Sequence, residues 1–144
     1  MTPSASLDPH TYRNYTPTPD LLADRIILVT GAGRGIGREV AIAYGGHGAS
    51  VILLDKHIRH LESVYDAIEA AGGPQPAIYP MNLEGATLKD YRDLGENIAT
   101  NFGRLDGLLQ NAGWVGGLTP LRHYDPAQWL RVMTVNLQAP FMLL

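Results

Sequence analysis

Four glycines stand within seven residues in the segment Thr30-Gly31-Ala32-Gly33-Arg34-Gly35-Ile36-Gly37. Glycines at this density let the backbone turn sharply and approach a ligand closely. When such a turn lies between a strand and a helix, the helix N-terminus adds unpaired N–H groups that attract phosphate. The alternative is a tight turn that binds nothing. The segment favours a pyrophosphate-binding turn, in which the ligand contacts are expected from Gly31, Arg34, Gly35, Ile36 and Gly37.

The spacing of the glycines excludes two common phosphate-binding patterns. No window fits the Walker pattern, which requires glycine, four residues and then Gly-Lys-Ser/Thr. The pattern Gly-x-Gly-x-x-Gly also fails from Gly31, because Ile36 occupies its last position. The pattern present is Thr-Gly-x-x-x-Gly-x-Gly.

An acidic residue supports a dinucleotide as the ligand. Asp55 ends the second apolar run, 18 residues after Gly37, which is close to the spacing typical of dinucleotide sites. Its carboxylate can accept hydrogen bonds from both hydroxyls of an adenosine ribose and would repel a 2′-phosphate. This favours NAD. NADP stays possible, because Arg34 and Lys56 could both reach a 2′-phosphate.

Regular alternation of strand and helix patterns must position these residues. Short apolar runs predict buried strands, and apolar residues at helical spacing predict helices. The expected strands are Arg25–Thr30, Ser50–Asp55, Ala77–Met81 and Leu105–Gln110; the expected helices are Ile36–Tyr44 (stopped by Gly45-Gly46), Ile58–Ile68, Leu88–Phe102 and Asp125 to the chain end. This order predicts an α/β fold, a Rossmann-type doubly wound parallel sheet with strand order 3-2-1-4.

The chain divides into two segments. Residues 1–20 contain four prolines and little apolar content, so we expect a tail. Residues 21–144 form the expected dinucleotide-binding domain. The sequence ends in an apolar helix without a capping signal, and the fourth strand would be an uncovered edge. We therefore expect a domain that is truncated at its C-terminus, or an edge that a partner covers.

Composition excludes several function classes. The 144 residues carry a net charge of −3, so nucleic acid is a poor candidate partner. Cysteine is absent, which excludes disulfides and thiolate metal sites. His57 and His60 lack an evident third ligand, so no metal site is expected. Without a signal-peptide pattern or an apolar run of about 18 residues, a cytoplasmic protein away from membranes is expected.

Further along the chain, three motifs in order resemble the short-chain dehydrogenase/reductase family over about Leu21–Leu144. They are the glycine turn, Asn111-Ala112-Gly113 after the fourth strand, and Val135-Asn136-Leu137 in the last helix. Asp20–Thr30 and Arg104–Gly113 resemble the bacterial YciK-like oxidoreductases in particular. The resemblance implies further cofactor contacts from Asn82, Leu83, Asn111, Ala112, Gly113 and Val135.

The resemblance implies hydride transfer between a nicotinamide and a small carbonyl or alcohol substrate. In the family a tyrosine is the acid/base, a lysine in a Tyr-x-x-x-Lys motif lowers its pKa, a serine orients the substrate, and an asparagine holds a relay water. Asn136 matches that asparagine and is the expected catalytic residue. No Tyr-x-x-x-Lys occurs in these 144 residues, so activity is assigned to a longer parent enzyme. Asn82 replaces the family's usual aspartate near the adenine, and Gln110 replaces another common asparagine.

Pro140 lies four residues after Asn136 in the expected last helix. Proline has no N–H to donate to the Asn136 carbonyl and crowds it sterically. We therefore expect a bent helix with a free carbonyl that can hold a water, against the alternative that the proline serves packing only.

The sequence is compatible with several functions. The leading one is the cofactor-binding part of an NAD(P)-dependent oxidoreductase, forming a homo-oligomer (dimer or tetramer) through the apolar last helix. The alternatives are a non-catalytic dinucleotide-binding module and a methyltransferase. Trp114 and Trp129 are expected to serve packing, although Trp114 is also placed to line a substrate mouth.

Overall fold

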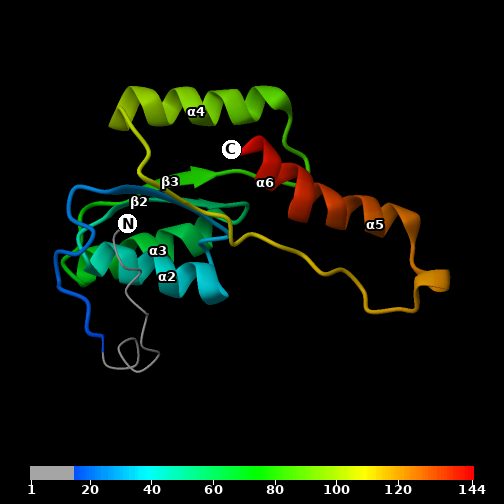
Figure 1. The fold of residues 1–144 in the computed structure, drawn as a ribbon, viewed down its shortest axis with the longest axis horizontal. Coiled ribbons are helices and arrows are strands. Elements are labelled where there is room, and N and C mark those ends of the chain that lie inside the picture. Colours follow the sequence, from blue (N-terminus) through cyan, green and yellow to red (C-terminus); the bar gives the residue numbers. More distant parts are fainter. Residues whose placement is uncertain (1–14) are drawn as a thin grey trace, which may run out of the picture.

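Four parallel strands form one sheet in the order β3-β2-β1-β4 in the computed structural model, which describes residues 15–144 (Figure 1). The strands are β1 (Ile26–Thr30), β2 (Ser50–Asp55), β3 (Ala77–Pro80) and β4 (Gly107–Leu109). The register pairs Thr30 of β1 with Leu54 of β2, so the carboxyl ends of these strands meet at one edge of the sheet. The predicted α/β class and strand order are confirmed. Of the predicted tail, residues 1–14 lie outside the described part.

Helices cover both faces of the sheet. α2 (Gly35–Gly46) and α3 (Ile58–Ala70) lie on one face, and α4 (Leu88–Phe102) and α6 (Ala139–Met142) lie on the other (Figure 1). Side chains of successive strand residues alternate between the two faces. In β1, Val29 packs with the first pair of helices and Leu28 with the second. Both are almost fully buried, which explains why the central strands are continuous apolar runs.

Helix α2 continues through Gly45 and ends at Gly46, with His47 as its C-cap, which corrects the predicted stop at Tyr44. A Cβ on Gly45 would lie only 2.6 Å from Cγ2 of Ile68 in α3. Glycine is therefore needed here for close packing of the two helices rather than for ending one. The chain turns at Gly48, whose φ of +93° suits glycine.

The fourth strand is shorter than predicted, because only Gly107–Leu109 join the sheet. On the N-terminal side, the carboxylate of Asp106 accepts the Ile26 N–H at 2.9 Å. Beyond Leu109, the Asn111 N–H bonds to the hydroxyl of Thr30 at 3.1 Å. At both ends of β4, side-chain oxygens therefore accept backbone N–H groups in place of the carbonyl oxygens of a neighbouring strand. At the sheet edge, Pro80 is the last residue of β3, where a missing N–H is tolerated.

The predicted last helix has three parts: α5 (Pro126–Met133), a π-helical turn η2 (Thr134–Gln138) and α6. The N–H of Ala139 donates to the Thr134 carbonyl, five residues earlier. Pro140 follows directly and has no N–H, so the α-helical bond to the Asn136 carbonyl does not form. The expected departure from a straight α-helix takes the form of this π turn. A water at that carbonyl stays a prediction.

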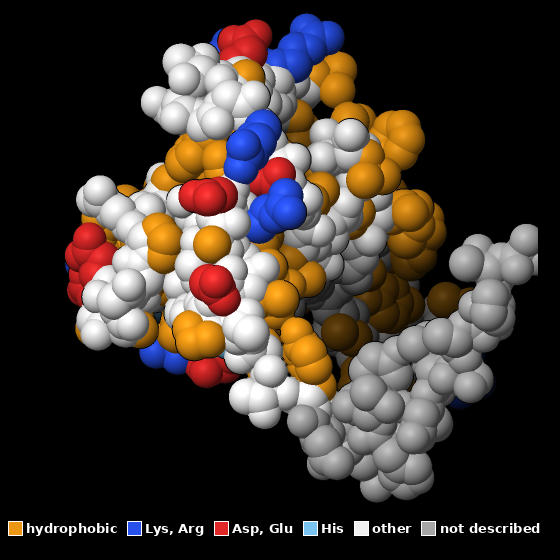
Figure 2. Space-filling view, turned by 60° about the vertical axis from the view of Figure 1, so that its left-hand side comes forward, with side chains coloured by type: hydrophobic (Ala, Val, Ile, Leu, Met, Phe, Trp, Pro, Cys, Tyr) orange, Lys and Arg blue, Asp and Glu red, His pale blue; other side chains and the backbone are white. Residues whose placement is uncertain are grey.

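Large apolar side chains remain exposed on the C-terminal part of the fold. They include Trp129 and Leu130 of α5, Leu137 of η2 and Phe141 of α6, with exposed fractions from 47% to 68%. The expectation that Trp129 serves packing is therefore not met within the described residues. Figure 2 shows hydrophobic side chains gathered along one side of the molecule. Among residues 15–144, no helix has both the length and the apolar character that a membrane crossing requires.

Candidate functional site

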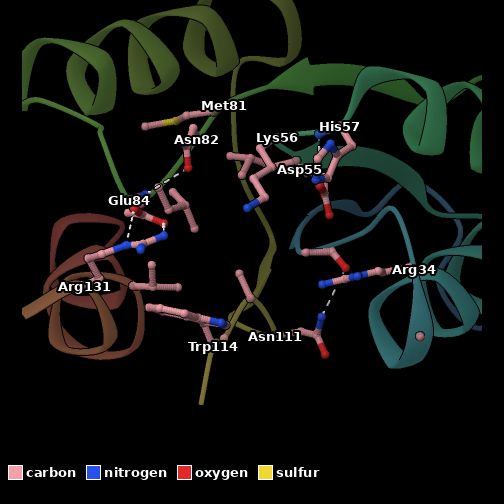
Figure 3. A pocket seen from close by; sticks show the side chains of 17 residues that line it. Arg34, Asp55, Lys56, His57, Met81, Asn82, Glu84, Asn111, Trp114 and Arg131 are labelled. Carbon is pink, nitrogen blue, oxygen red and sulfur yellow. Dashed lines mark hydrogen bonds and ion pairs between the residues drawn. The ribbon is translucent and has the colours of Figure 1, made fainter. Parts of the chain in front are cut away.

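A cavity of about 420 Å³ lies where the carboxyl ends of the strands meet (Figure 3). Each strand contributes residues at or just beyond its end: Gly31 follows β1, Asp55 ends β2, Asn82 follows β3, and Asn111 follows β4. Open parallel sheets bind their ligands outside this edge.

The glycine turn needs its glycines for two different reasons. Gly31 and Gly35 have φ values of +64° and +56° and line the cavity, so they provide the left-handed backbone of the turn. Gly37 is buried, and a Cβ there would lie 2.2 Å from the Gly31 carbonyl oxygen and 2.5 Å from Nδ2 of Asn111. Gly37 therefore lets the first turn of α2 approach the strand ends and does not itself line the cavity.

Thr30 joins the glycine turn to the loop after β4. Its side chain is 1% exposed, and Oγ1 accepts the N–H groups of Asn111 and Ala112 at 3.1 and 3.0 Å. The same hydroxyl donates to the Leu109 carbonyl at 3.3 Å. In return, Nδ2 of Asn111 donates to the Thr30 carbonyl at 3.1 Å. One hydroxyl and one amide thus hold two cavity walls together.

Asp55 is fixed by backbone donors. Its Oδ2 accepts the Gly33 N–H at 3.2 Å, and its Oδ1 accepts the His57 N–H at 3.1 Å. Arg34 and Lys56 line the same end of the cavity (Figure 3). Within residues 15–144, neither cation is engaged in a salt bridge.

The side chain of Asn136 bonds to the backbone of Trp114. Nδ2 donates to the Trp114 carbonyl and Oδ1 accepts the Trp114 N–H, both at 2.8 Å. This reciprocal pair connects the π turn to the loop after β4. Asn136 therefore positions that loop through its amide, and its catalytic role stays a prediction.

The other end of the cavity is closed by an ion pair. Glu84 accepts two hydrogen bonds from Arg131, at 2.6 and 3.2 Å. The hydrogen bond from Arg131 lowers the pKa of Glu84, and the same bond raises the pKa of Arg131. The guanidinium carbon lies 4.6 Å from the centre of the Trp114 ring, within the range of a cation–π contact.

Most of the predicted ligand contacts come together at this cavity. Those that line it are Gly31, Arg34, Gly35, Asp55, Asn82, Leu83, Asn111, Ala112, Gly113 and Val135. Ile36, Gly37 and Asn136 do not. The Ile36 side chain is 75% exposed next to the turn.

Sequence reasoning did not assign five further residues that line the cavity: Leu54, His57, Met81, Glu84 and Arg131. Most are neighbours of assigned positions at the strand ends. Arg131 could have been found from its place four residues before Val135, which puts both on one helix face. Trp114, weighed as a packing or mouth residue, lines the cavity as well.

Metal-binding residues are not clustered in the part of the chain that the structure describes. No three His, Asp or Glu side chains lie close enough there to hold an ion. The rings of His57 and His60 are neighbours, with centroids 5.2 Å apart.

Comparisons with known proteins agree with this arrangement. The family model for short chain dehydrogenases matches residues 25–144. The uncharacterized oxidoreductase YciK of Escherichia coli K12 is 45% identical over 130 residues, which cover 90% of this chain and 52% of that protein. The chain thus spans about half the length of the curated relatives it matches.

Solved structures are also similar to this chain, again over about half of their own length. A structure from Pseudomonas syringae is 50% identical with a TM-score of 0.87, covering 90% of this chain and 54% of that one. A Shigella flexneri structure in complex with NADP is 44% identical with a TM-score of 0.85, covering 88% of this chain and 53% of that one.

Proposed function

The chain belongs to the short-chain dehydrogenase family, and we propose that it is the cofactor-binding part of an NAD(P)-dependent oxidoreductase. The observation that carries the proposal is the cavity at the strand ends, bounded by the glycine turn, the N-terminus of α2 and Asp55. A bound nicotinamide dinucleotide would supply or accept hydride at a carbonyl or alcohol carbon. The glycine turn and the first N–H groups of α2 would hold its pyrophosphate.

The charges at the Asp55 end favour NADP(H) as the cofactor, in place of the NAD expected from Asp55 alone. Both carboxylate oxygens of Asp55 already accept backbone N–H groups, which offsets part of its negative charge. Arg34 and Lys56 line the same end and would attract a 2′-phosphate. A Shigella flexneri relative has been solved with NADP, which supports this choice.

The cofactor preference can be tested by titrating NADPH and NADH into the protein at its natural length. The double variant Arg34→Ala/Lys56→Ala should weaken NADPH binding about tenfold or more, because charge-assisted bonds to phosphate are strong. NADH binding should change little. Lys89→Ala, which removes an exposed cation of α4 that does not line the cavity, is the matched control. An unchanged ratio of the two affinities would refute the assignment of the 2′-phosphate site, and binding of neither dinucleotide would refute the proposed function.

Catalysis is proposed for the protein at its natural length. Within these residues Asn136 is the proposed catalytic residue, through its backbone carbonyl, because its side-chain amide is committed to Trp114. A gene that continues into a Tyr-x-x-x-Lys motif would support the enzyme. A gene product of 144 residues that binds NADPH would instead be a non-catalytic dinucleotide-binding module.

The exposed apolar residues of α5, η2 and α6 support a homo-oligomer as part of the proposal. A face of this kind is typical of subunit contacts. Light scattering on the natural protein should give a dimer or a tetramer, and Phe141→Asp should shift it toward the monomer. A monomeric wild-type protein would contradict this part.

A further inference from the structure

Three side chains from separate elements meet at the end of the cavity opposite Arg34 (Figure 3). Glu84 follows β3, Trp114 follows β4, and Arg131 belongs to α5. We call these three residues the clasp. The carboxylate holds the guanidinium with two hydrogen bonds, and the indole ring supports it at 4.6 Å. The clasp therefore ties the loops after two strands to a helix that lies outside the sheet.

The clasp differs from an ordinary surface ion pair, which contributes little because water screens it. In α4, Lys89 pairs with Asp93 within one helix, and 80% of the lysine side chain is exposed. The Arg131 side chain is also 55% exposed, but its partner Glu84 is 29% exposed and lies 47 positions away in the sequence. The bidentate geometry and the aromatic support fix the guanidinium in position.

The cavity next to the clasp has the chemistry of a base-binding slot. Leu83, immediately before Glu84, and Val135, one helical turn after Arg131, both line it. Asn82 adds an amide whose Oδ1 accepts the Glu84 N–H at 3.2 Å, and whose Nδ2 has no hydrogen-bond partner within residues 15–144. Apolar walls with one free amide donor suit the flat face and the ring nitrogens of a purine.

We propose that the clasp closes the base end of the cleft, and that Arg131 is a positioning residue that slows the release of an adenine nucleotide. The inference rests on the proposed function, because it needs a dinucleotide in this cavity. Arg131 would act through Glu84 and Trp114, by holding the loops after β3 and β4 together around the base. Its loss would therefore speed release of the nucleotide and leave the rate of association almost unchanged.

The test uses Arg131→Met, which keeps an unbranched apolar stem but removes the guanidinium group, and with it both hydrogen bonds and the charge. Stopped-flow fluorescence would measure binding and release of NADPH and of adenosine 2′,5′-bisphosphate by the protein at its natural length. We expect release of both ligands to become about tenfold faster, with the association rate within about twofold. Lys89→Met is the control, since it removes an exposed ion pair whose two residues do not line the cavity.

One further variant separates positioning from general stability. Arg131→Lys keeps the charge but not the bidentate contact, so an intermediate release rate is expected, with the melting temperature of the ligand-free protein unchanged. Unchanged release rates in Arg131→Met would overturn the inference, as would a loss of affinity through slower association alone. If the wild-type protein bound neither ligand, the proposed function itself would fail, which is a different result.

Discussion

Replacing Gly37 by alanine tests whether the close approach of α2 to the strand ends builds the site. The new methyl group would lie 2.2 Å from the Gly31 carbonyl oxygen, whereas ordinary contacts begin at 3.4 Å. The helix or the turn must therefore move by roughly 1.2 Å. Overpacking of this kind costs about 3 kcal/mol at the upper end of its usual range, and the helix preference of alanine returns about 1 kcal/mol. We expect a net loss of about 2 kcal/mol, or about thirtyfold in the ratio of folded to unfolded protein.

The displaced atoms of Gly31 and Asn111 belong to cavity residues, so Gly37→Ala should also weaken NADPH binding at least tenfold. Urea unfolding followed by circular dichroism and a fluorescence titration measure the two effects. Gly46→Ala is the matched control in the same helix, because a Cβ there meets nothing within 4 Å. It should leave NADPH binding unchanged and the stability equal or higher. If Gly37→Ala matched the wild-type protein in both assays, the packing argument would be wrong.

Three other substitutions test single contacts. Thr30→Val leaves two backbone N–H groups without their acceptor and should lower the free energy of unfolding by about 2 kcal/mol or more, whereas Thr30→Ser should restore most of it in urea titrations. Asn136→Asp places a carboxylate against the Trp114 carbonyl in place of a donor, so thermal melting should show a larger loss than in Asn136→Ala. The N–H of Ile26, helped by neighbouring guanidinium groups, lowers the pKa of Asp106 below 3.8. The ionised Asp106 carboxylate stabilises the fold fully above pH 3.8, and this stabilisation is lost as the pH falls through the lower pKa that Asp106 has in the folded protein. Asp106→Asn should therefore flatten the acid side of a curve of unfolding free energy against pH.

The central strands could be predicted from sequence because burial on both faces imposes a local pattern. β1 and β2 are runs of large apolar residues, and each contacts helices on both sides. The glycine turn was predictable for a similar reason, since Gly31 and Gly35 have backbone angles that few other residues adopt. Gly45 misled the prediction, because its role depends on Ile68, which is 23 residues away on another helix.

The clasp could not be predicted, because no local pattern relates Glu84 to Arg131. Their pairing depends on how far α5 extends past the sheet, which the tertiary packing decides. The hydroxyl of Thr30 shows the same limit: a β-branched residue at a strand end is ordinary, and its three hydrogen bonds follow from where β4 stops. Pro140 indicated an irregular helix but not which bonds would replace the lost one.

The π turn at Thr134–Gln138 has a consequence for how this helix is compared with others. A turn closed over five residues contains one residue more than an α-helical turn, so every later side chain is rotated by about 100° relative to a regular helix. The turn is equivalent to a one-residue insertion within a helix. Deleting a residue from it should therefore restore a regular α-helix and leave Phe141 and its neighbours on the faces they now occupy. Residues before Thr134 and residues after Gln138 therefore cannot be assigned to one helix face by counting three or four positions across the turn.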